Sequence, residues 1–278
     1  MKIFRSQKGF SAIELLITVG IMGFVLAALY NIMISQQRTY EAQKDVSVTQ
    51  RDVRAATSYL ERDIRMAGLA VPRGTNPVAA FQNGTGLNPA APDSISINFS
   101  PGPLTYLRTA AVQLPGTDNI IQVDSIASFN VGDTINIINN ETNNLLGQYT
   151  VSAVNSGNNE LSLNSNPLLD GVIDIGFLVA RNFKTINYQV TANAVTGRNE
   201  LVRNDGVVQS TIIDGITDFQ ISYILDDGSE VTAPANLIDV RRIRMDVTAA
   251  TIKQTARLGG QPTSRELTTL VPIKNIRL

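Results

Sequence analysis

Glu14 is the one charged side chain in a long apolar stretch near the N-terminus. Between Phe10 and Ile34, a run of 25 residues, it alone carries a charge. A carboxylate in a helix that crosses a membrane costs about 3 kcal/mol, so an acid in such a place is expected to have a function. The positive end of the helix dipole favours an acid, and a free amine nearby would neutralise it. Glu14 is therefore a candidate for charge pairing with an N-terminal amine.

A short basic segment precedes the apolar run. Residues 1–9 carry Lys2, Arg5 and Lys8 and no acid. Because basic residues beside a span stay in the cytoplasm, these three are predicted to send the rest of the chain across the membrane. At about 1.5 Å per residue, a helix over residues 10–34 is long enough to cross a hydrocarbon core of about 30 Å.

The position of a glycine distinguishes this segment from an ordinary secretory signal. Such a signal has a small-residue cleavage site after its apolar region, and no Ala-x-Ala pattern follows Ile34. Here the glycine stands before the apolar run, in Lys8-Gly9-Phe10-Ser11-Ala12-Ile13-Glu14-Leu15-Leu16. This motif closely resembles the class III signal of type IV pilins and type II secretion pseudopilins.

The resemblance implies a processing site and an assembly residue. A prepilin peptidase would cut between Gly9 and Phe10 on the cytoplasmic face and methylate the new Phe10 amine, while the apolar helix stays in the mature protein. Glu14 matches the family's buried glutamate, which faces the Phe10 amine of a neighbouring subunit. Removing either partner would leave an uncompensated charge in apolar packing. The alternative is a plain membrane anchor whose Glu14 reaches the cytoplasmic interface.

The helical pattern continues past the apolar run, over residues 35–68. An apolar stripe with spacings of three and four comprises Val46, Thr49, Val53, Ala56, Leu60, Ile64 and Ala67, and Gly68 and Pro72 follow as a stop. An unbroken helix from Ser11 to Ala67 is about 85 Å long. We expect its first half to contact lipid or other subunits and its second half to pack on a domain of its own chain.

Three residues inside the apolar run bear on the shape of the helix. Gly20 and Gly23 allow a kink or a close helix approach, or are simply tolerated. Major pilins commonly have a proline 17 residues after the glutamate, where this chain has Asn31. Their local melting is therefore not carried over to this chain.

The remainder is rich in strand and turn signals. Residues 69–117 are predicted to be a connecting region with one strand, Ser94–Phe99. Residues 118–168 are predicted to form a β insert with strands at Ile120–Val123, Thr134–Ile138, Tyr149–Val154 and Glu160–Leu163. Its run from Ile126 to Asp133, with Phe129 and Val131 expected in the core, resembles a small β-barrel insert of PilW-like sequences.

Residues 169–278 are predicted to be an antiparallel sheet domain. Apolar residues alternate with polar ones at Ile186, Tyr188 and Val190, at Phe219, Ile221 and Tyr223, and at Ile243, Met245 and Val247. Asp227-Gly228 indicates a hairpin, and Leu270–Leu278 resembles the final strand of PilW and J-type proteins. With the helical stripe covering one face of the sheet, the expected fold class is α+β.

Composition argues against an enzyme. The chain has no histidine or cysteine, and its net charge is −1. The usual catalytic triads, thiol nucleophiles and zinc sites therefore have no ligands or bases, no cofactor is expected, and no basic footprint for nucleic acid is present. Asp226, Asp227 and Glu230 are weak calcium candidates because their spacing matches no dedicated loop. Asp170 and Asp174 are expected to serve turns.

A second resemblance narrows the family. The segment Gln50-Arg51-Asp52-Val53-Arg54 and the segment from Leu60 to Gly68 look like the PilW group of minor pilins and are similar to J-type pseudopilins. The resemblance implies a subunit that primes or caps a type IV pilus. Its partners would be other major and minor pilins, the prepilin peptidase, the inner-membrane assembly platform and membrane lipid. It would lie in a bacterial inner membrane with its C-terminal domain in the periplasm, and later on the pilus at the cell surface. A J-type pseudopilin and a membrane-anchored periplasmic adhesin remain as alternatives.

Overall fold

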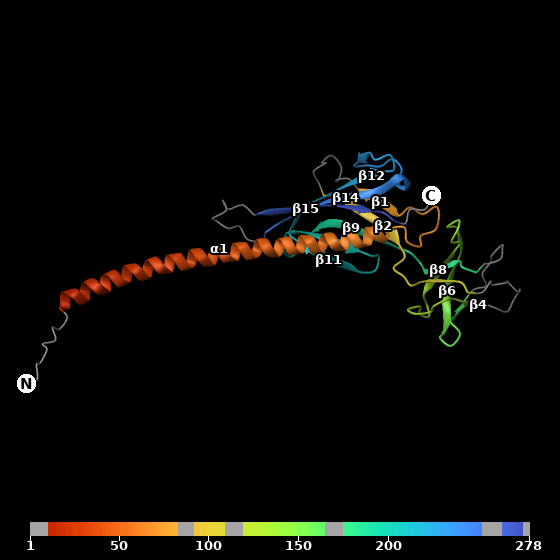
Figure 1. Cartoon of the computed structure of the whole chain (residues 1–278), viewed down its shortest axis with the longest axis horizontal. Coiled ribbons are helices and arrows are strands. Elements are labelled where there is room, and N and C mark those ends of the chain that lie inside the picture. The colour runs from red at the N-terminus through yellow and green to blue at the C-terminus, as the bar shows by residue number, and fades with distance from the viewer. Residues whose placement is uncertain (1–10, 83–91, 109–118, 165–174, 252–262, 275–278) are drawn as a thin grey trace, which may run out of the picture. The chain divides into compact units, whose positions relative to one another are not determined.

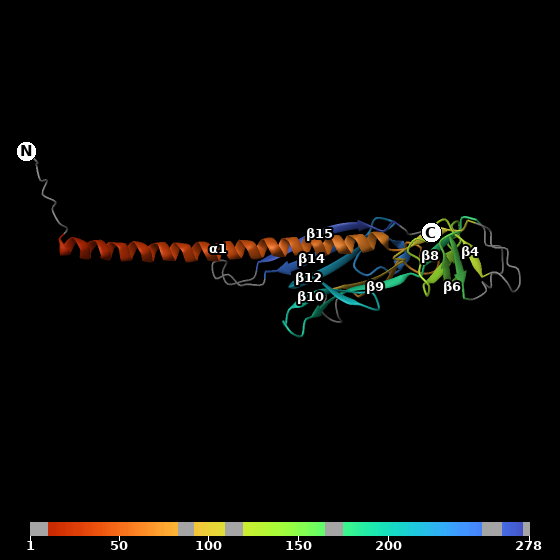
Figure 2. The same cartoon turned by 90° about the horizontal axis from the view of Figure 1, so that it is seen from below.

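The computed structural model describes residues 11–82, 92–108, 119–164, 175–251 and 263–274. Two compact units make up the chain: residues 1–50 with 251–263, and residues 51–250 with 264–278. The strands and the C-terminal part of the helix that packs on them belong to the second unit. Figures 1 and 2 show the elements from two directions.

Helix α1 runs without a break from Ala12 to Met66, a length of 55 residues. This confirms the expected long helix, and it shows that the helix is continuous through Asn31, which the sequence alone left open. A Cβ added at Gly20 or Gly23 would meet no atom within 4 Å, so neither glycine marks a close contact with the described residues. The helix stops where Gly68 adopts a φ of 78°. Glycine takes this left-handed conformation without strain, and helices commonly end in this way.

Two antiparallel sheets form the body of the second unit. The first has the order β1-β2-β9-β10-β11 and the second β13-β12-β14-β15. The strands of the first sheet are β1 (Val78–Gln82), β2 (Ser94–Phe99), β9 (Lys184–Ala192), β10 (Asn199–Asn204) and β11 (Gln209–Asp214). Those of the second are β12 (Ile216–Leu225), β13 (Glu230–Val231), β14 (Val240–Ala250) and β15 (Ser264–Pro272), with the short helix η1 (Leu237–Asp239) before β14.

Gly215 carries the chain from the first sheet into the second. Its φ is 78°, its N–H donates to the Asn199 carbonyl at 2.9 Å, and its carbonyl accepts from Ala250 N–H at 3.0 Å. A Cβ at this position would overlap the Arg198 guanidinium and lie 3.2 Å from the Ala250 carbonyl oxygen. Only glycine therefore fits the step between β11 and β12 without strain.

The buried stripe of α1 packs on the inner faces of both sheets in one hydrophobic core. The helix contributes Val53, Ala56, Leu60, Ile64 and Ala67. The sheets contribute the alternating residues expected from the sequence, including Ile186, Tyr188, Phe219, Ile221, Tyr223, Ile243, Met245 and Val247. On the other side of β14, Arg242 and Arg244 are exposed. One face of the second sheet is thus covered and the other is wet, which confirms the α+β class.

The third sheet is a small barrel with a core of its own. Its strands are β3 (Leu104–Tyr106), β4 (Ile120–Gln122), β5 (Thr134–Ile138), β6 (Leu145–Asn155), β7 (Glu160–Leu163) and β8 (Leu178–Arg181), in the order β3-β8-β5-β6-β7-β4. A bridge between Leu107 and Val123 joins its two edges and curls the sheet on itself. Phe129 is buried in the barrel as predicted. Val131 is 65% exposed, and its prediction as core is wrong because it lies in a tight turn where Asp133 N–H donates to the Asn130 carbonyl.

The barrel is fastened to the residues that directly follow α1. Arg73 N–H donates to the Asn143 carbonyl at 2.7 Å, and Asn143 Nδ2 donates to the Val71 carbonyl at 3.0 Å. Ala70, Ile138 and Ala180 form a small buried cluster at the same place. The barrel is therefore held by side-chain packing and by hydrogen bonds as well as by its two chain connections.

All four strands predicted within residues 118–168 are present, but β4 ends one residue earlier than predicted, at Gln122, and β6 is longer than predicted, from Leu145 to Asn155. β2, β5 and β7 have the expected bounds. Residues 69–117 contain β1 and β3 in addition to the expected strand, and the barrel takes β3 and β8 from outside residues 118–168. β15 ends at Pro272 and so overlaps the first three residues of the strand expected at Leu270–Leu278; residues 273 and 274 are not in a strand, and the last four residues of that prediction lie outside the described part of the chain. β15 is an edge strand with one exposed side, and the first half of its sequence is polar. Its residues therefore show no clear apolar alternation.

Candidate functional site

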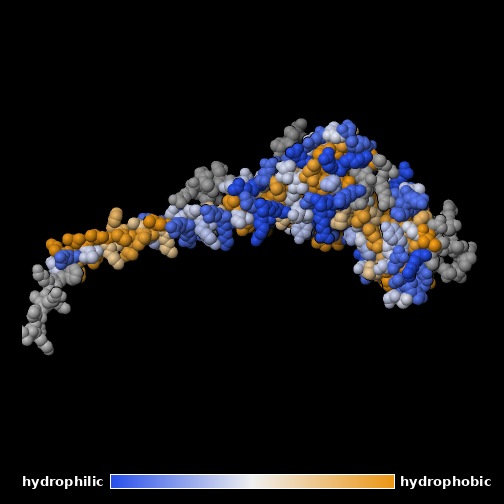
Figure 3. Space-filling view, viewed as in Figure 1, coloured by the Kyte–Doolittle hydropathy of each residue, from blue (hydrophilic) through white to orange (hydrophobic). Residues whose placement is uncertain are grey.

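The first half of α1 is apolar and exposed. An 18-residue window of this helix has a mean hydropathy of 2.3 and no buried residue, and Phe24 is 77% exposed. Figure 3 shows the apolar colouring over this part of the helix. Exposed apolar surface of this length is stable only against lipid or other apolar helices. This half of α1 is therefore a candidate membrane span.

Glu14 stands in the first turn of this apolar half and caps the helix. Its Oε2 accepts a hydrogen bond from Ser11 N–H at 3.0 Å, while Ser11 Oγ accepts from Ile13 N–H at 3.4 Å. Thr18 Oγ1 donates to the main-chain carbonyl of Glu14. Ser-x-x-Glu before an apolar run is the sequence signature of a capping box. Glu14 was predicted to pair with a charge, and its capping role was not predicted, although the signature is present in the sequence.

The capping contact leaves room for a partner of Glu14. A carboxylate has about four acceptor positions on its two oxygens, and among the described residues only Ser11 N–H donates to this one. Glu14 can therefore cap its own helix and still accept a hydrogen bond from an ammonium group outside the chain.

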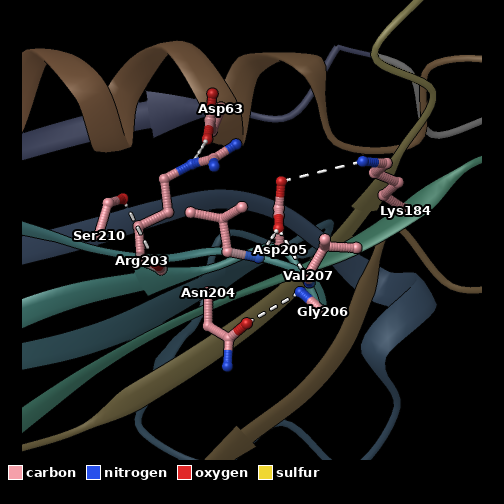
Figure 4. Close-up of polar contacts among 9 residues, drawn as sticks. Asp63, Lys184, Arg203, Asn204, Asp205, Gly206, Val207 and Ser210 are labelled. Atoms are coloured by element: carbon pink, nitrogen blue, oxygen red, sulfur yellow. Dashed lines mark hydrogen bonds and ion pairs between the residues drawn. The ribbon is translucent and has the colours of Figure 1, made fainter.

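A buried carboxylate anchors the second half of α1 to the first sheet. Asp63 Oδ2 accepts from the Tyr188 hydroxyl at 2.6 Å and from Arg203 Nε at 2.9 Å, as Figure 4 shows for Arg203. The side chain of Asp63 is only 11% exposed and that of Arg203 26%. A buried acid without such partners would be strongly destabilising. The three residues therefore hold α1 at one place over β9 and β10.

The electrostatics of this anchor are visible in its pKa values. Burial, followed by the Asp63 hydrogen bond, raises the pKa of Tyr188 far above its usual value. Burial disfavours the charge on Arg203, but its contacts with Asp63 outweigh that effect and raise the pKa of Arg203. The anchor therefore consists of a neutral phenol and a guanidinium cation that share one carboxylate oxygen. The anchor was not predicted from the sequence, although Asp63 lies beside Ile64 at the edge of the apolar stripe.

The hairpin between β10 and β11 continues from this anchor. Asp205 Oδ1 accepts from Val207 N–H at 3.1 Å and from Val208 N–H at 2.8 Å, and its other oxygen lies 3.8 Å from Lys184 Nζ (Figure 4). The hydrogen bonds from Val208 and Val207, with the charge of Lys184, lower the pKa of Asp205. The turn is therefore fixed relative to Arg203, two residues earlier.

The calcium candidates each have a separate partner. Asp226 lies 3.7 Å from Arg241, Asp227 accepts from Ser229 N–H at 2.8 Å, and Glu230 contacts Arg244 at 3.3 Å. No group of three or more acid, histidine or cysteine side chains able to hold a metal occurs among the described residues. The turn at Asp227-Gly228 joins β12 to β13, and the predicted hairpin is confirmed.

The remaining predicted site residues lie outside the described part of the chain. These are Lys2, Arg5 and Lys8 of the leader, Gly9 and Phe10 of the processing site, and Asp170 and Asp174. Of the residues assigned to processing and assembly, Glu14 is the one that the structure places.

The fold is α+β, with one long helix whose apolar half is a candidate span and whose other half packs on antiparallel sheets. No protein-family model and no curated protein matches the sequence. Among solved structures, the chain is similar to a type IV-like pilin from Thermus thermophilus, with 10% identity and a TM-score of 0.36 over 82% of this chain and 98% of that one. A likeness at this level decides neither fold nor function.

Proposed function

We propose that this chain is a type IV pilin-like subunit, a minor pilin of the PilW group that primes or caps a pilus. The observation that carries the proposal is the division of α1 into two halves. The first is exposed, apolar and headed by Glu14, whereas the second is buried on the sheets through its stripe and Asp63. A subunit built in this way can exchange lipid for the helices of its neighbours while its body stays folded.

Processing would prepare the helix for assembly. Lys2, Arg5 and Lys8 would hold the leader in the cytoplasm, and a prepilin peptidase would cut between Gly9 and Phe10 and methylate the Phe10 amine. Because α1 begins at Ala12, the new amine would stand two residues before the positive end of the helix dipole. The Glu14 carboxylate of a neighbouring subunit would neutralise it and select the stagger of the two chains.

The proposed division of the chain follows from this role. Residues 1–9 are the leader, residues 10–34 the membrane and assembly helix, residues 35–68 the amphipathic helix, and the rest the periplasmic body with its insert. The partners are other major and minor pilins, the peptidase, the inner-membrane assembly platform and lipid. The protein acts by assembly rather than by catalysis, first in the inner membrane and then on the pilus.

Processing is tested by the mass of the mature N-terminus. We expect the mature chain to begin at Phe10 with one added methyl group, and an intact Met1 would point instead to a membrane-tethered module. Glu14→Ala should leave cleavage normal and reduce incorporation into sheared pili. The matched control is Glu41→Ala, which removes an exposed acid from α1 beyond the proposed membrane segment. Normal incorporation of Glu14→Ala would remove the register role of this side chain.

Two rivals are separated by other observations. A J-type pseudopilin would be encoded beside genes of a secretion apparatus rather than beside pilus genes. A periplasmic adhesin is favoured by one feature, the barrel with its separate core. It predicts that deletion of the barrel abolishes target binding and leaves pilus assembly unchanged.

A further inference from the structure

Helix α1 has a basic stripe on the side opposite its buried face. We propose that this stripe binds an acidic patch on the outer face of the second sheet in another copy of the chain. The stripe consists of Arg51, Arg54, Arg62 and Arg65, which fall within an arc of about 80° at 3.6 residues per turn. All four are exposed. The inference deepens the proposed function because it names a contact through which such subunits would stack.

Two of the four arginines have no ion pair among the described residues. Arg65 contacts Glu61 at 2.5 Å, and Arg51 lies 3.4 Å from Asp52 with 76% of its own side chain exposed. Arg54 and Arg62 have no carboxylate within 4.0 Å in the described part of the chain. Like charges three and four residues apart on a helix repel one another. A surface that presents carboxylates would therefore gain from contact with this stripe.

The acidic patch lies on the wet face of the second sheet. Asp218 pairs across the strands with Thr248, and Thr248 pairs in turn with Glu266. Asp246 stands two residues before Thr248 on the same face of β14, between the buried Met245 and Val247. Asp218 accepts from Gln220 Nε2 at 2.8 Å, and Asp246 accepts from Thr268 Oγ1. None of the three acids forms an ion pair with a described residue.

The two surfaces match in size. Arg54 and Arg62 are eight residues apart, about 12 Å along the helix axis. Asp218 and Glu266 lie on strands two places apart, which separates them by about 10 Å. Ser58 lies at the centre of the stripe and Thr248 at the centre of the patch. Both side chains are short, so charged groups on either side can approach.

The stripe and the patch cannot meet within one molecule. The helix packs on the inner face of the second sheet, whereas the patch is on the outer face and the stripe points away from the sheets. A contact between them is therefore heterologous, with each copy using a different surface, and such contacts build open helical arrays. Arg242, which is exposed at the other end of the same outer face, would repel the stripe and so favour one direction of stacking.

Cross-linking of the full chain in detergent micelles tests the contact. The chain has no cysteine, so Ser58→Cys in one tagged copy and Thr248→Cys in another introduce unique thiols for a short bifunctional maleimide. We expect a heterologous Ser58–Thr248 product that falls on raising the salt from about 0.15 M to about 1 M. The control is Thr211→Cys on the exposed strand β11, which should give little product with Ser58→Cys.

Charge reversal decides whether the stripe and the patch cause the cross-link. Arg54→Glu with Arg62→Glu should lower the yield about tenfold, and Asp218→Lys with Asp246→Lys should do the same. Combining the two reversed copies should restore it. Ser58–Ser58 products in excess, or no restoration, would overturn the proposal. A third result would overturn the proposal in favour of another ligand. In that case no cross-link forms between copies, but the chain binds duplex DNA or phosphatidylglycerol vesicles and loses this binding in Arg54→Glu with Arg62→Glu. Failure of the cross-link with normal processing and incorporation would refute this inference and leave the proposed function standing.

Discussion

Asp63→Ala is expected to be among the most destabilising substitutions of a polar residue in the helix. The Asp63 carboxylate accepts hydrogen bonds from Tyr188 at 2.6 Å and from Arg203 at 2.9 Å. Hydrogen bonds to a charged group contribute about 1.5–3 kcal/mol each, and breaking a buried pair costs about 3–5 kcal/mol. Because 26% of the Arg203 side chain is exposed, water can hydrate the guanidinium in the variant and offset part of the lost interaction free energy. We therefore expect the free energy of unfolding to fall by about 3 kcal/mol.

Urea unfolding of the full chain in detergent micelles, followed by tyrosine fluorescence, measures this loss. Tyr188→Phe removes one of the two hydrogen bonds and should cost about 1.5 kcal/mol. Asp63→Ala and Arg203→Met should be strongly non-additive, with a coupling of about 2 kcal/mol in a double-mutant cycle. The control Asp52→Ala removes an exposed acid from the same helix and should change stability by less than about 0.5 kcal/mol. A loss below about 1 kcal/mol for Asp63→Ala, or additivity of the pair, would refute the anchor.

Two further predictions concern the step between the sheets and the buried phenols. Gly215→Ala should lower the free energy of unfolding by about 2 kcal/mol, because its φ of 78° strains any residue with a side chain and its Cβ would crowd the Ala250 carbonyl and displace the Arg198 guanidinium. Gly132 also has a positive φ but has open space around it, and Gly132→Ala should cost less in the same assay. Burial, followed by the hydrogen bond to Asp63, raises the pKa of Tyr188. Burial, followed by the negative charge of Asp93, raises the pKa of Tyr223. A group with a raised folded pKa contributes its full stability below its unfolded pKa, about 10 for tyrosine, and loses it as the pH rises. Stability should therefore fall above about pH 10, and Tyr188→Phe should reduce the slope by about 1.4 kcal/mol per pH unit; an unchanged slope would contradict the role assigned to its burial.

Periodicity made the helix and the central strands predictable. Leu60 and Ile64 on α1 and Phe219 and Ile221 on β12 are buried as their spacing implies, because one face of each element meets the core. β2 was recognised because Ile95 and Ile97 alternate with serine between turn residues. Here local pattern and tertiary packing agree.

Edge strands and polar contacts were not predictable in the same way. β1 and β15 lie at sheet edges, where only one side of the strand is buried and the alternation is weak. The Asp63 anchor joins residues 125 and 140 positions apart in the chain. Such a pairing depends on the register of α1 over β9 and β10, which no local spacing encodes. The capping box of Ser11 and Glu14 is different, because its signature is local and was readable from the sequence.

The fastening of the barrel has a mechanical consequence. A pull on the barrel would reach the end of α1 along several parallel paths: the Asn143 contacts with Val71 and Arg73, the bond from Ser100 Oγ to the Arg181 carbonyl at 2.7 Å, and the two chain connections. A force that several hydrogen bonds share breaks them less readily than the same force acting on one hydrogen bond at a time. A force applied to the barrel would therefore reach α1 before the chain between the two unfolds.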